Sequence, residues 1–231
     1  MAFVERENKI LKIIQGLVNA DIDFIVVGGY AVSSLARHRF SVDCDIVISK
    51  ELLDDSEKFL GEQGYKKHIE RSGFDEIYAG EFVSYEKRVL DLPVTVDLLV
   101  NSLVCRATGA SWSYDYIQKH SVEANILGLE ASVRCRIPEK ELLIAFKIHS
   151  GRRADVRDVI MLIENADIEK VLNHIKRGNI DALKNQVRKI IYALDDVNLI
   201  NSLKGVFTLI VDVKKQITNS KKFIDIISTN I

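Results

Sequence analysis

The sequence predicts an α+β protein, with a mixed β-sheet flanked by helices over residues 1–137 and an all-helical region over residues 138–231. Two observations predict this class. Short apolar runs rich in branched residues alternate with segments of helical spacing in the first part, whereas after Asp167 every apolar stripe has helical spacing. The hydrophobic content of 47% over 231 residues is typical of a chain that builds its own core.

The first elements are predicted from apolar spacing and from glycines. Apolar residues at helical intervals indicate a helix from Asn8 to Ala20, and the run from Asp23 to Val27 indicates a buried strand. Two glycines follow that strand and precede the next helix. Further elements are expected at Tyr30–Arg37 (helix), Val42–Ile48 (strand) and Lys50–Gln63 (helix, with Ser49 as its N-cap).

The middle of the chain is predicted to be rich in strands. These are Tyr65–Glu70, Glu81–Lys87, Thr95–Val100 and a hairpin of Ala124–Leu129 and Ser132–Ile137 that turns near Gly128, with a short helix at Tyr114–His120. Pro138 is expected to be the first residue of a helix that Gly151 ends, and another helix is expected at Ala154–Asn165.

The rear of the chain carries three predicted helical stripes, of which the last comprises Leu203, Phe207, Ile210, Val211 and Ile217. From Ala166 onward there are 11 basic and 7 acidic residues, so the remaining 21 basic and 26 acidic residues give the front a net charge of −5. The net charge of +4 at the rear could attract RNA phosphates, or it could belong to solvated helix faces.

Several classes of protein are not expected. No apolar run reaches the 18 residues of a membrane span, and the N-terminus is charged where a signal peptide is apolar. The three cysteines form no CxxC pair, so we expect a reduced, cytoplasmic protein. The five histidines lack metalloprotease spacing, and no P-loop or serine-hydrolase motif is present.

Two features of the front could hold a metal–nucleotide complex. Gly28 and Gly29 end a strand before a helix, where glycine permits close approach of a phosphate and the helix N–H groups can bind it. Asp43 and Asp45 are spaced i, i+2 on a strand, so both carboxylates point to one face and suit Mg²⁺ or Mn²⁺. The alternatives are a turn that uses glycine for steric reasons and an exposed acidic strand face.

Asp97 is a third acid, within the apolar strand Val94–Val100. Aspartate is disfavoured in strands and is seldom buried without a partner, so a position beside Asp43 and Asp45 as a third metal ligand would explain it. The alternative is an acid on an open strand face. Cys44, between the first two acids, is expected to point to the core, as is Trp112.

The order of these residues resembles the nucleotidyltransferase superfamily typified by polymerase-β-like enzymes. Its signature is an apolar residue, two small residues, a spacer, an acid-x-acid strand and a third acid on a later strand, which here are Val27, Gly28, Gly29, Asp43, Asp45 and Asp97. The resemblance implies a nucleotidyltransferase-type sheet, a catalytic domain at residues 1–137, and a helical region at residues 138–231 that contributes to the active-site cleft. It also implies two divalent ions bound by the three acids, with a nucleoside triphosphate as substrate.

A narrower resemblance is to the AbiEii/MenT-type toxin nucleotidyltransferases. It is carried by Arg39-x-Ser41-x-Asp43-x-Asp45 and by a stretch in which a helix with Lys147 is followed by Gly151-Arg152 and by Asp155-x-x-Asp158. The resemblance implies that Lys147 contacts the triphosphate and that Arg39, Ser41 and Arg152 help to bind the nucleotide. Asp155 and Asp158 would hold Lys147 and Arg152, or one would serve as a base. The alternatives are a surface lysine and a solvated helix face.

The sequence departs from the superfamily directly after the first glycine. Many members have serine after the first glycine, where it contacts the triphosphate, whereas here Gly29 and then Tyr30 follow Gly28. The phosphate contact is left to backbone N–H groups, Ser33 or Ser41.

The predicted function is transfer of a nucleoside monophosphate from a nucleoside triphosphate to a hydroxyl of RNA, such as a tRNA, or of a protein. The resemblance implies the toxin of a toxin–antitoxin pair, with an antitoxin protein as a further partner. The alternative is a catalytically silent module that binds nucleotide or a partner on the same fold.

Overall fold

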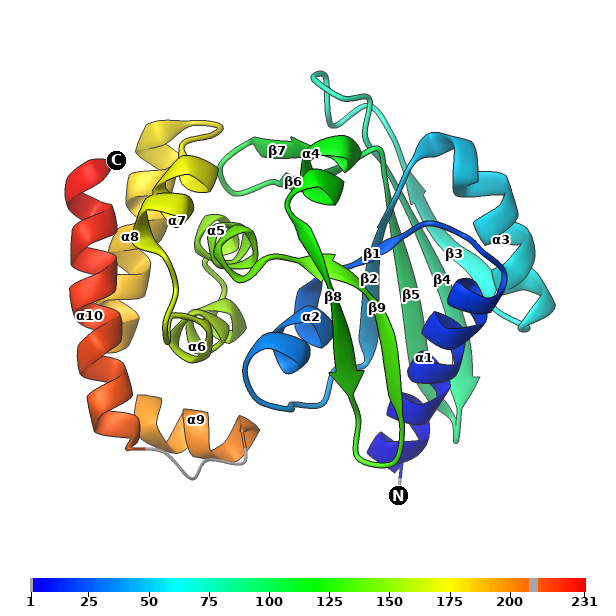
Figure 1. Ribbon diagram of the computed structural model, residues 1–231, viewed down its shortest axis with the longest axis horizontal. Coiled ribbons are helices and arrows are strands. Elements are labelled where there is room, and N and C mark those ends of the chain that lie inside the picture. The colour runs from blue at the N-terminus through cyan, green and yellow to red at the C-terminus, as the bar shows by residue number, and fades with distance from the viewer. Residues whose placement is uncertain (1, 208–211) are drawn as a thin grey trace. The chain divides into compact units, whose positions relative to one another are not determined.

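The computed structural model describes residues 2–207 and 212–231. They divide into two compact units (Figure 1). The first, the sheet unit, comprises Met1–Ser34, Phe40–Leu103 and Trp112–Pro138. The second, the helical unit, comprises Leu35–Arg39, Val104–Ser111 and Glu139–Ile231. Two short segments of the front of the chain therefore belong to the helical unit.

A five-stranded mixed sheet in the order β1-β2-β5-β4-β3 forms the centre of the sheet unit. Only β2 and β5 are parallel, and the other neighbours are antiparallel. The strands are β1 (Ile25–Val26), β2 (Asp43–Ile48), β3 (Lys66–Arg71), β4 (Glu81–Val89) and β5 (Leu92–Val100). Short helix α2 (Gly28–Leu35) connects β1 to β2.

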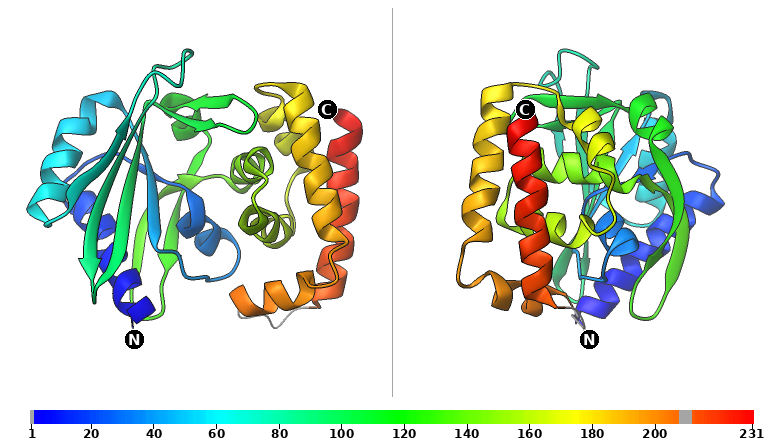
Figure 2. Two further views of the ribbon diagram at one scale, coloured as in Figure 1. Left: turned by 180° about the vertical axis from the view of Figure 1, so that it is seen from behind. Right: turned by 60° about the vertical axis from the view of Figure 1, so that its left-hand side comes forward.

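One face of this sheet packs against α1 (Ala2–Asn19) and α3 (Leu53–Glu62), as Figures 1 and 2 show. Period-2 alternation along β5 buries Val94, Val96, Leu98 and Val100 on this side. Cys44 of β2 is fully buried there too, as predicted. We call this side the helix-covered face.

The remaining elements of the sheet unit are a hairpin of β8 (Ser121–Leu127) and β9 (Ser132–Pro138), α4 (Tyr114–Lys119) and the 3-10 turn Lys50–Leu52. Strand β9 lies beside β1 and α1. A two-stranded sheet joins β6 (Ser102–Cys105) to β7 (Ala110–Ser113), and it contains the fully buried Trp112. The sequence did not indicate β6 or β7.

The helical unit is built around α5 (Lys140–Ser150), whose side chains are buried on nearly every side. It packs against α6 (Arg153–Leu162), α7 (Ile168–Ile175) and α8 (Ile180–Leu194), and α10 (Val213–Asn230) lies alongside α8 (Figure 2). Helix α9 (Leu199–Val206) completes the unit. Of the third predicted stripe, Ile210 and Val211 lie outside the described residues.

Several predicted boundaries were wrong, among them the start of α1, which lies at Ala2 rather than Asn8. Pro138 is the last residue of β9, where it pairs with Ser121, and α5 starts only after Glu139. Helix α2 starts at Gly28 itself rather than at Tyr30. The predicted end of α5 is confirmed, because Gly151 adopts φ of 59° and caps the helix. Within the described residues, no helix is long and apolar enough to span a membrane.

Candidate active site

Asp43, Asp45 and Asp97 lie on one face of the five-stranded sheet, which we call the carboxylate face. Asp43 and Asp45 alternate with the buried Cys44 on β2, and Asp45 is in register with Asp97 on the adjacent parallel strand β5. Residues in register on neighbouring strands point to the same side. The oxygens of the three carboxylates are not all within 4.8 Å of one another, so they form a row rather than a closed cluster.

Two hydroxyl groups orient the outer members of this row. Ser84 Oγ on β4 donates a hydrogen bond of 2.6 Å to Asp97 Oδ1, and Thr95 Oγ1 on β5 donates one of 2.8 Å to Asp43 Oδ1. Each hydroxyl is the direct neighbour of its carboxylate across the sheet. The sequence alone indicated neither residue, because strand register cannot be read from the chain.

Gly28 lies against the central carboxylate. Its φ is +65°, and a Cβ placed on it would lie 2.0 Å from Asp45 Oδ2. Any side chain at this position would therefore collide with the acid. Val27 N–H also donates to the Asp45 carbonyl, at 2.9 Å, which fixes the glycine turn beside β2.

The pKa of Asp97 is raised to about 6. Burial is the main cause, and the negative charges of Asp45 and Asp43 add to it, while the hydrogen bond from Ser84 opposes it. A divalent cation would relieve this repulsion. Three carboxylates on one face are the hard oxygen donors that Mg²⁺ and Mn²⁺ prefer, so these residues fit such an ion.

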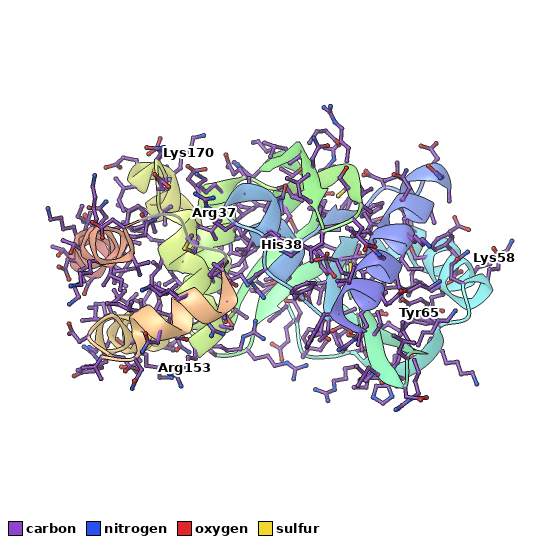
Figure 3. All side chains as sticks on the ribbon, turned by 90° about the horizontal axis from the view of Figure 1, so that it is seen from below. Arg37, His38, Lys58, Tyr65, Arg153 and Lys170 are labelled. Carbon is purple, nitrogen blue, oxygen red and sulfur yellow. The ribbon has the colours of Figure 1, made fainter. Side chains whose placement is uncertain are left out.

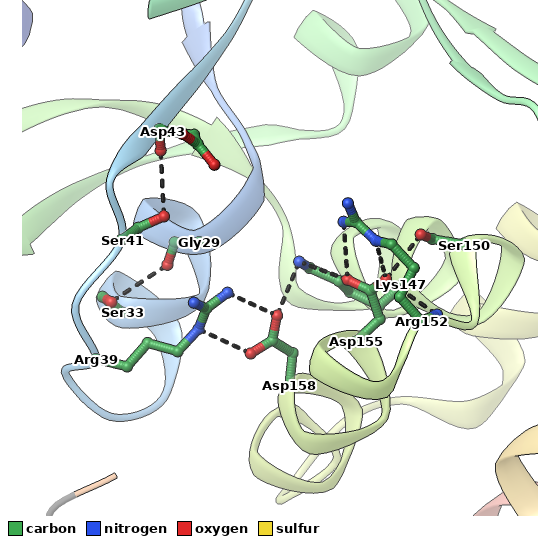
Figure 4. A network of polar contacts seen from close by, with 10 residues as sticks. All are labelled: Gly29, Ser33, Arg39, Ser41, Asp43, Lys147, Ser150, Arg152, Asp155 and Asp158. Carbon is green, nitrogen blue, oxygen red and sulfur yellow. Dashed lines mark hydrogen bonds and ion pairs between the residues drawn. The ribbon is translucent and has the colours of Figure 1, made fainter. Parts of the chain in front are cut away.

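The helical unit contains a buried ionic network around Lys147 (Figure 4). Lys147 Nζ lies 3.1 Å from Asp155 Oδ1 and 2.8 Å from Asp158 Oδ2. Arg39 forms an ion pair of 2.9 Å with Asp158, and Arg152 Nε one of 2.7 Å with Asp155. Three cations therefore surround two carboxylates that are at most 1% exposed.

The burial of this network excludes a surface lysine and a solvated helix face. Ser150 Oγ also donates to Asp155, at 2.7 Å. Burial would raise the pKa of Asp155, but Arg152 and Lys147 outweigh it and lower this pKa to about 2. Such a carboxylate is a poor base, so the arrangement favours holding Lys147 and Arg152 in place over proton abstraction.

The predicted phosphate-binding hydroxyls have partners within the chain. Ser33 Oγ donates to the Gly29 carbonyl at 3.2 Å within α2, and Ser41 Oγ donates to the Asp43 carbonyl at 3.2 Å (Figure 4). Tyr30, which follows the two glycines, is buried and donates to the Ser41 carbonyl at 2.9 Å. The phosphate-binding roles of Gly29 and Ser41 stay predictions.

No protein-family model matches the sequence, and no curated protein matches it. Solved structures do share its fold. A proposed nucleotidyltransferase from H. pylori is similar over 98% of this chain and 95% of its own, with a TM-score of 0.51 and 16% identity. The antibiotic-resistance factor ANT(2'')-Ia is similar over 84% of this chain and 97% of its own, with a TM-score of 0.50 and 15% identity. The chain therefore has the nucleotidyltransferase fold, which confirms the fold predicted from its sequence.

Proposed function

We propose that the protein is a metal-dependent nucleotidyltransferase, which moves a nucleoside monophosphate from a nucleoside triphosphate to an acceptor hydroxyl. The observation that carries the proposal is the row of Asp43, Asp45 and Asp97 on one sheet face, with Gly28 packed against the central acid. The fold supports it independently of the residues.

In this proposal the three acids hold Mg²⁺ or Mn²⁺, which would supply positive charge for the attacking hydroxyl and for the departing pyrophosphate. The N–H groups at the start of α2 bind phosphate oxygens. Ser84 and Thr95 keep Asp97 and Asp43 oriented. The ionic network around Lys147 has one positive charge in excess, which suits a role in binding the triphosphate.

The acceptor we propose is a hydroxyl of RNA, such as a tRNA, or of a protein, and the biological role is that of a toxin with an antitoxin partner. The resemblance of the segments around Asp43 and Lys147 to AbiEii/MenT-type toxins supports this role. The similar protein ANT(2'')-Ia is an antibiotic-resistance factor, so small-molecule acceptors belong in the same assay.

The test is a pyrophosphate-release assay with each labelled nucleoside triphosphate, Mg²⁺ and total RNA, followed by identification of what carries the label. We expect release by the wild type and none by Asp43→Asn/Asp45→Asn. Mg²⁺ and nucleotide should raise the melting temperature of the wild type. At a hundredfold excess of ligand over Kd, the free energy of unfolding should increase by about 2.7 kcal/mol.

A silent nucleotide-binding module is the second candidate, since Ser33 is hydrogen-bonded within α2 and Gly29 stands where many superfamily members have serine. This module would show the same rise in melting temperature with Mg²⁺ and nucleotide, but it would release no pyrophosphate. A wild type that shows neither response contradicts both functions.

A further inference from the structure

Three of the four basic residues of the edge strand β3, Lys66, His68 and Arg71, form what we call the basic strip. All three side chains are exposed. The strand pairs with β4 on one side only, so its outer edge is open within the five-stranded sheet. Such an edge is available to a ligand.

The register places the basic strip on the carboxylate face. Lys66 is opposite Glu86, which is opposite Thr95, the residue that bonds Asp43. Arg71 is opposite Phe82, which is opposite Leu99, two residues after Asp97 on β5. Because side chains in register share a face, Lys66 and Arg71 point to the same side as the three acids.

A β-bulge turns His68 to this side as well. The register shifts between Lys67 and Ile69, which leaves His68 as the extra residue, and bulges redirect side chains in this way. The His68 ring lies within electrostatic reach of the Asp97 carboxylate.

The basic strip differs from its neighbour Lys67 in forming no ion pair with the described residues. Lys67 points to the helix-covered face and forms ion pairs with Glu57 at 2.9 Å and Glu70 at 3.2 Å. Lys66, His68 and Arg71 form no side-chain hydrogen bond or ion pair with any residue that the structure describes. Glu86, opposite Lys66 in register, forms no ion pair with it.

The strand order separates two sides of the carboxylate row. The Gly28 turn and the start of α2 lie at the β1–β2 side, against Asp45. The basic strip lies on the other side of Asp97, two strands and about 10 Å away. In an in-line displacement the attacking oxygen and the leaving group lie on opposite sides of the reacting phosphorus. A triphosphate held at the α2 side therefore leaves the β3 side to the acceptor.

We propose that the basic strip of β3 binds the phosphodiester backbone of an RNA acceptor. This inference rests on the proposed function and names the acceptor's side of the same site. Lys66 and Arg71 are positively charged and form no ion pair with a described residue, so they attract a polyanion and repel a polycationic acceptor. A distance of about 10 Å corresponds to about three nucleotides of one strand, so backbone phosphates reach the strip while a hydroxyl reaches the acids.

In the reaction an RNA hydroxyl oxygen forms a bond to the α-phosphorus of the nucleoside triphosphate. The bond between that phosphorus and the β-phosphate bridging oxygen breaks, pyrophosphate leaves, and the hydroxyl proton passes to water. The products are RNA bearing one added nucleotide, pyrophosphate and a proton.

The test compares Lys66→Gln/Arg71→Gln with the wild type, using bulk tRNA as the probe. Binding is measured by fluorescence polarisation over a range of salt concentrations, and transfer by the label reaching tRNA. Loss of two phosphate contacts should raise the Kd and the KM for tRNA about tenfold, and should reduce the salt slope of binding by about 1.4. Mg²⁺ and nucleotide should raise the melting temperature of this variant as much as that of the wild type.

The matched control is Lys12→Gln/Lys58→Gln, which removes the same charge from exposed positions on α1 and α3 (Lys58 is labelled in Figure 3). It should change the tRNA Kd less than twofold. Equal tRNA binding by the wild type and the Lys66/Arg71 variant, with pyrophosphate still released, overturns the acceptor site alone. Label that reaches only protein also overturns it, whereas no pyrophosphate from the wild type with any acceptor overturns the proposed function.

Discussion

The Asp97 carboxylate is partly buried and lies beside two other carboxylates on the same face of the sheet. Its pKa in the folded protein, about 6, lies above the ordinary value of 3.8, so folding favours the protonated form. The stability that this provides is complete below pH 3.8 and is lost as the pH rises through 6. Asparagine resembles the protonated acid and can still accept the hydrogen bond from Ser84.

We therefore expect metal-free Asp97→Asn to melt no lower than the wild type at pH 7. Its melting temperature should also lack the decline that Asp97 causes between pH 4 and 6. Thermal melting across this range checks both effects. A clearly lower melting temperature of the variant at pH 7 would show that the charged carboxylate stabilises the metal-free fold.

Ser84→Ala removes the hydrogen bond that opposes the raised pKa of Asp97. We expect this pKa to rise further, so that Mg²⁺-dependent pyrophosphate release begins at a higher pH and needs more Mg²⁺ than in the wild type. The control is Ser56→Ala, which removes another buried hydroxyl, bonded to the Leu52 carbonyl in α3. An unshifted pH profile in Ser84→Ala would exclude the positioning role.

Spacing within one strand predicted Asp43 and Asp45 on a common face, because side chains alternate along β2. The contacts of Ser84 and Thr95 depend instead on which strands are neighbours and in what register. Those pairings are set by the packing of the whole sheet, so no local pattern indicated these two hydroxyls.

At the scale of elements, the network between α5 and α6 should be a large contributor to the stability of the helical unit. Lys147→Met keeps the packing of the stem but leaves Asp155 and Asp158 buried with less countercharge. We expect a loss of about 3–5 kcal/mol in the free energy of unfolding, as for other broken buried ion pairs. Urea unfolding measures it.

Lys170→Met is the matched control, because Lys170 pairs with Glu139 at 3.4 Å in the same unit but is exposed. Exposed pairs contribute little, so no measurable change is expected. If Lys147→Met unfolds at the same urea concentration as this control, the network does not stabilise the unit.

The predicted element boundaries were wrong where long-range contacts set the ends of the elements. Pro138 suits a helix start, but pairing of β8 with β9 extends the strand to it. Helix α1 starts at Ala2, well before Asn8, and its first turns are tied down by Arg6, which donates to the Pro93 carbonyl, and by Glu7, which accepts from Leu129 N–H. Strands β6 and β7 have four residues each, too few for a visible period.

At the scale of the whole molecule, the helical unit contains a buried histidine with the opposite response to acid from Asp97. His149 Nε2 donates to the Ile175 carbonyl at 2.8 Å, because a carbonyl only accepts, and Nδ1 then accepts from Thr108 Oγ1 at 2.7 Å. Burial lowers the pKa of His149 to about 4, with Arg177 adding to the effect. The neutral ring is favoured, so this stability is present above pH 6.5 and is lost as the pH falls toward 4.

Acid should therefore act on the two units in opposite directions. Between pH 6.5 and 4, His149 weakens the helical unit, while protonation of Asp97 strengthens the metal-free sheet unit. We expect hydrogen exchange, corrected for its intrinsic pH dependence, to show less protection of α5 and α7 at pH 5 than at pH 7, and more protection of β2 and β5. Asp97→Asn should remove the gain in the strands and leave the loss in the helices, because the two groups belong to different units.

Equal changes throughout the chain would mean that both units open in one cooperative step. The opposed proton-binding effects would then largely cancel in a single unfolding free energy. Adding Mg²⁺ and nucleotide should abolish the gain in the strands, since metal binding requires Asp97 to be deprotonated.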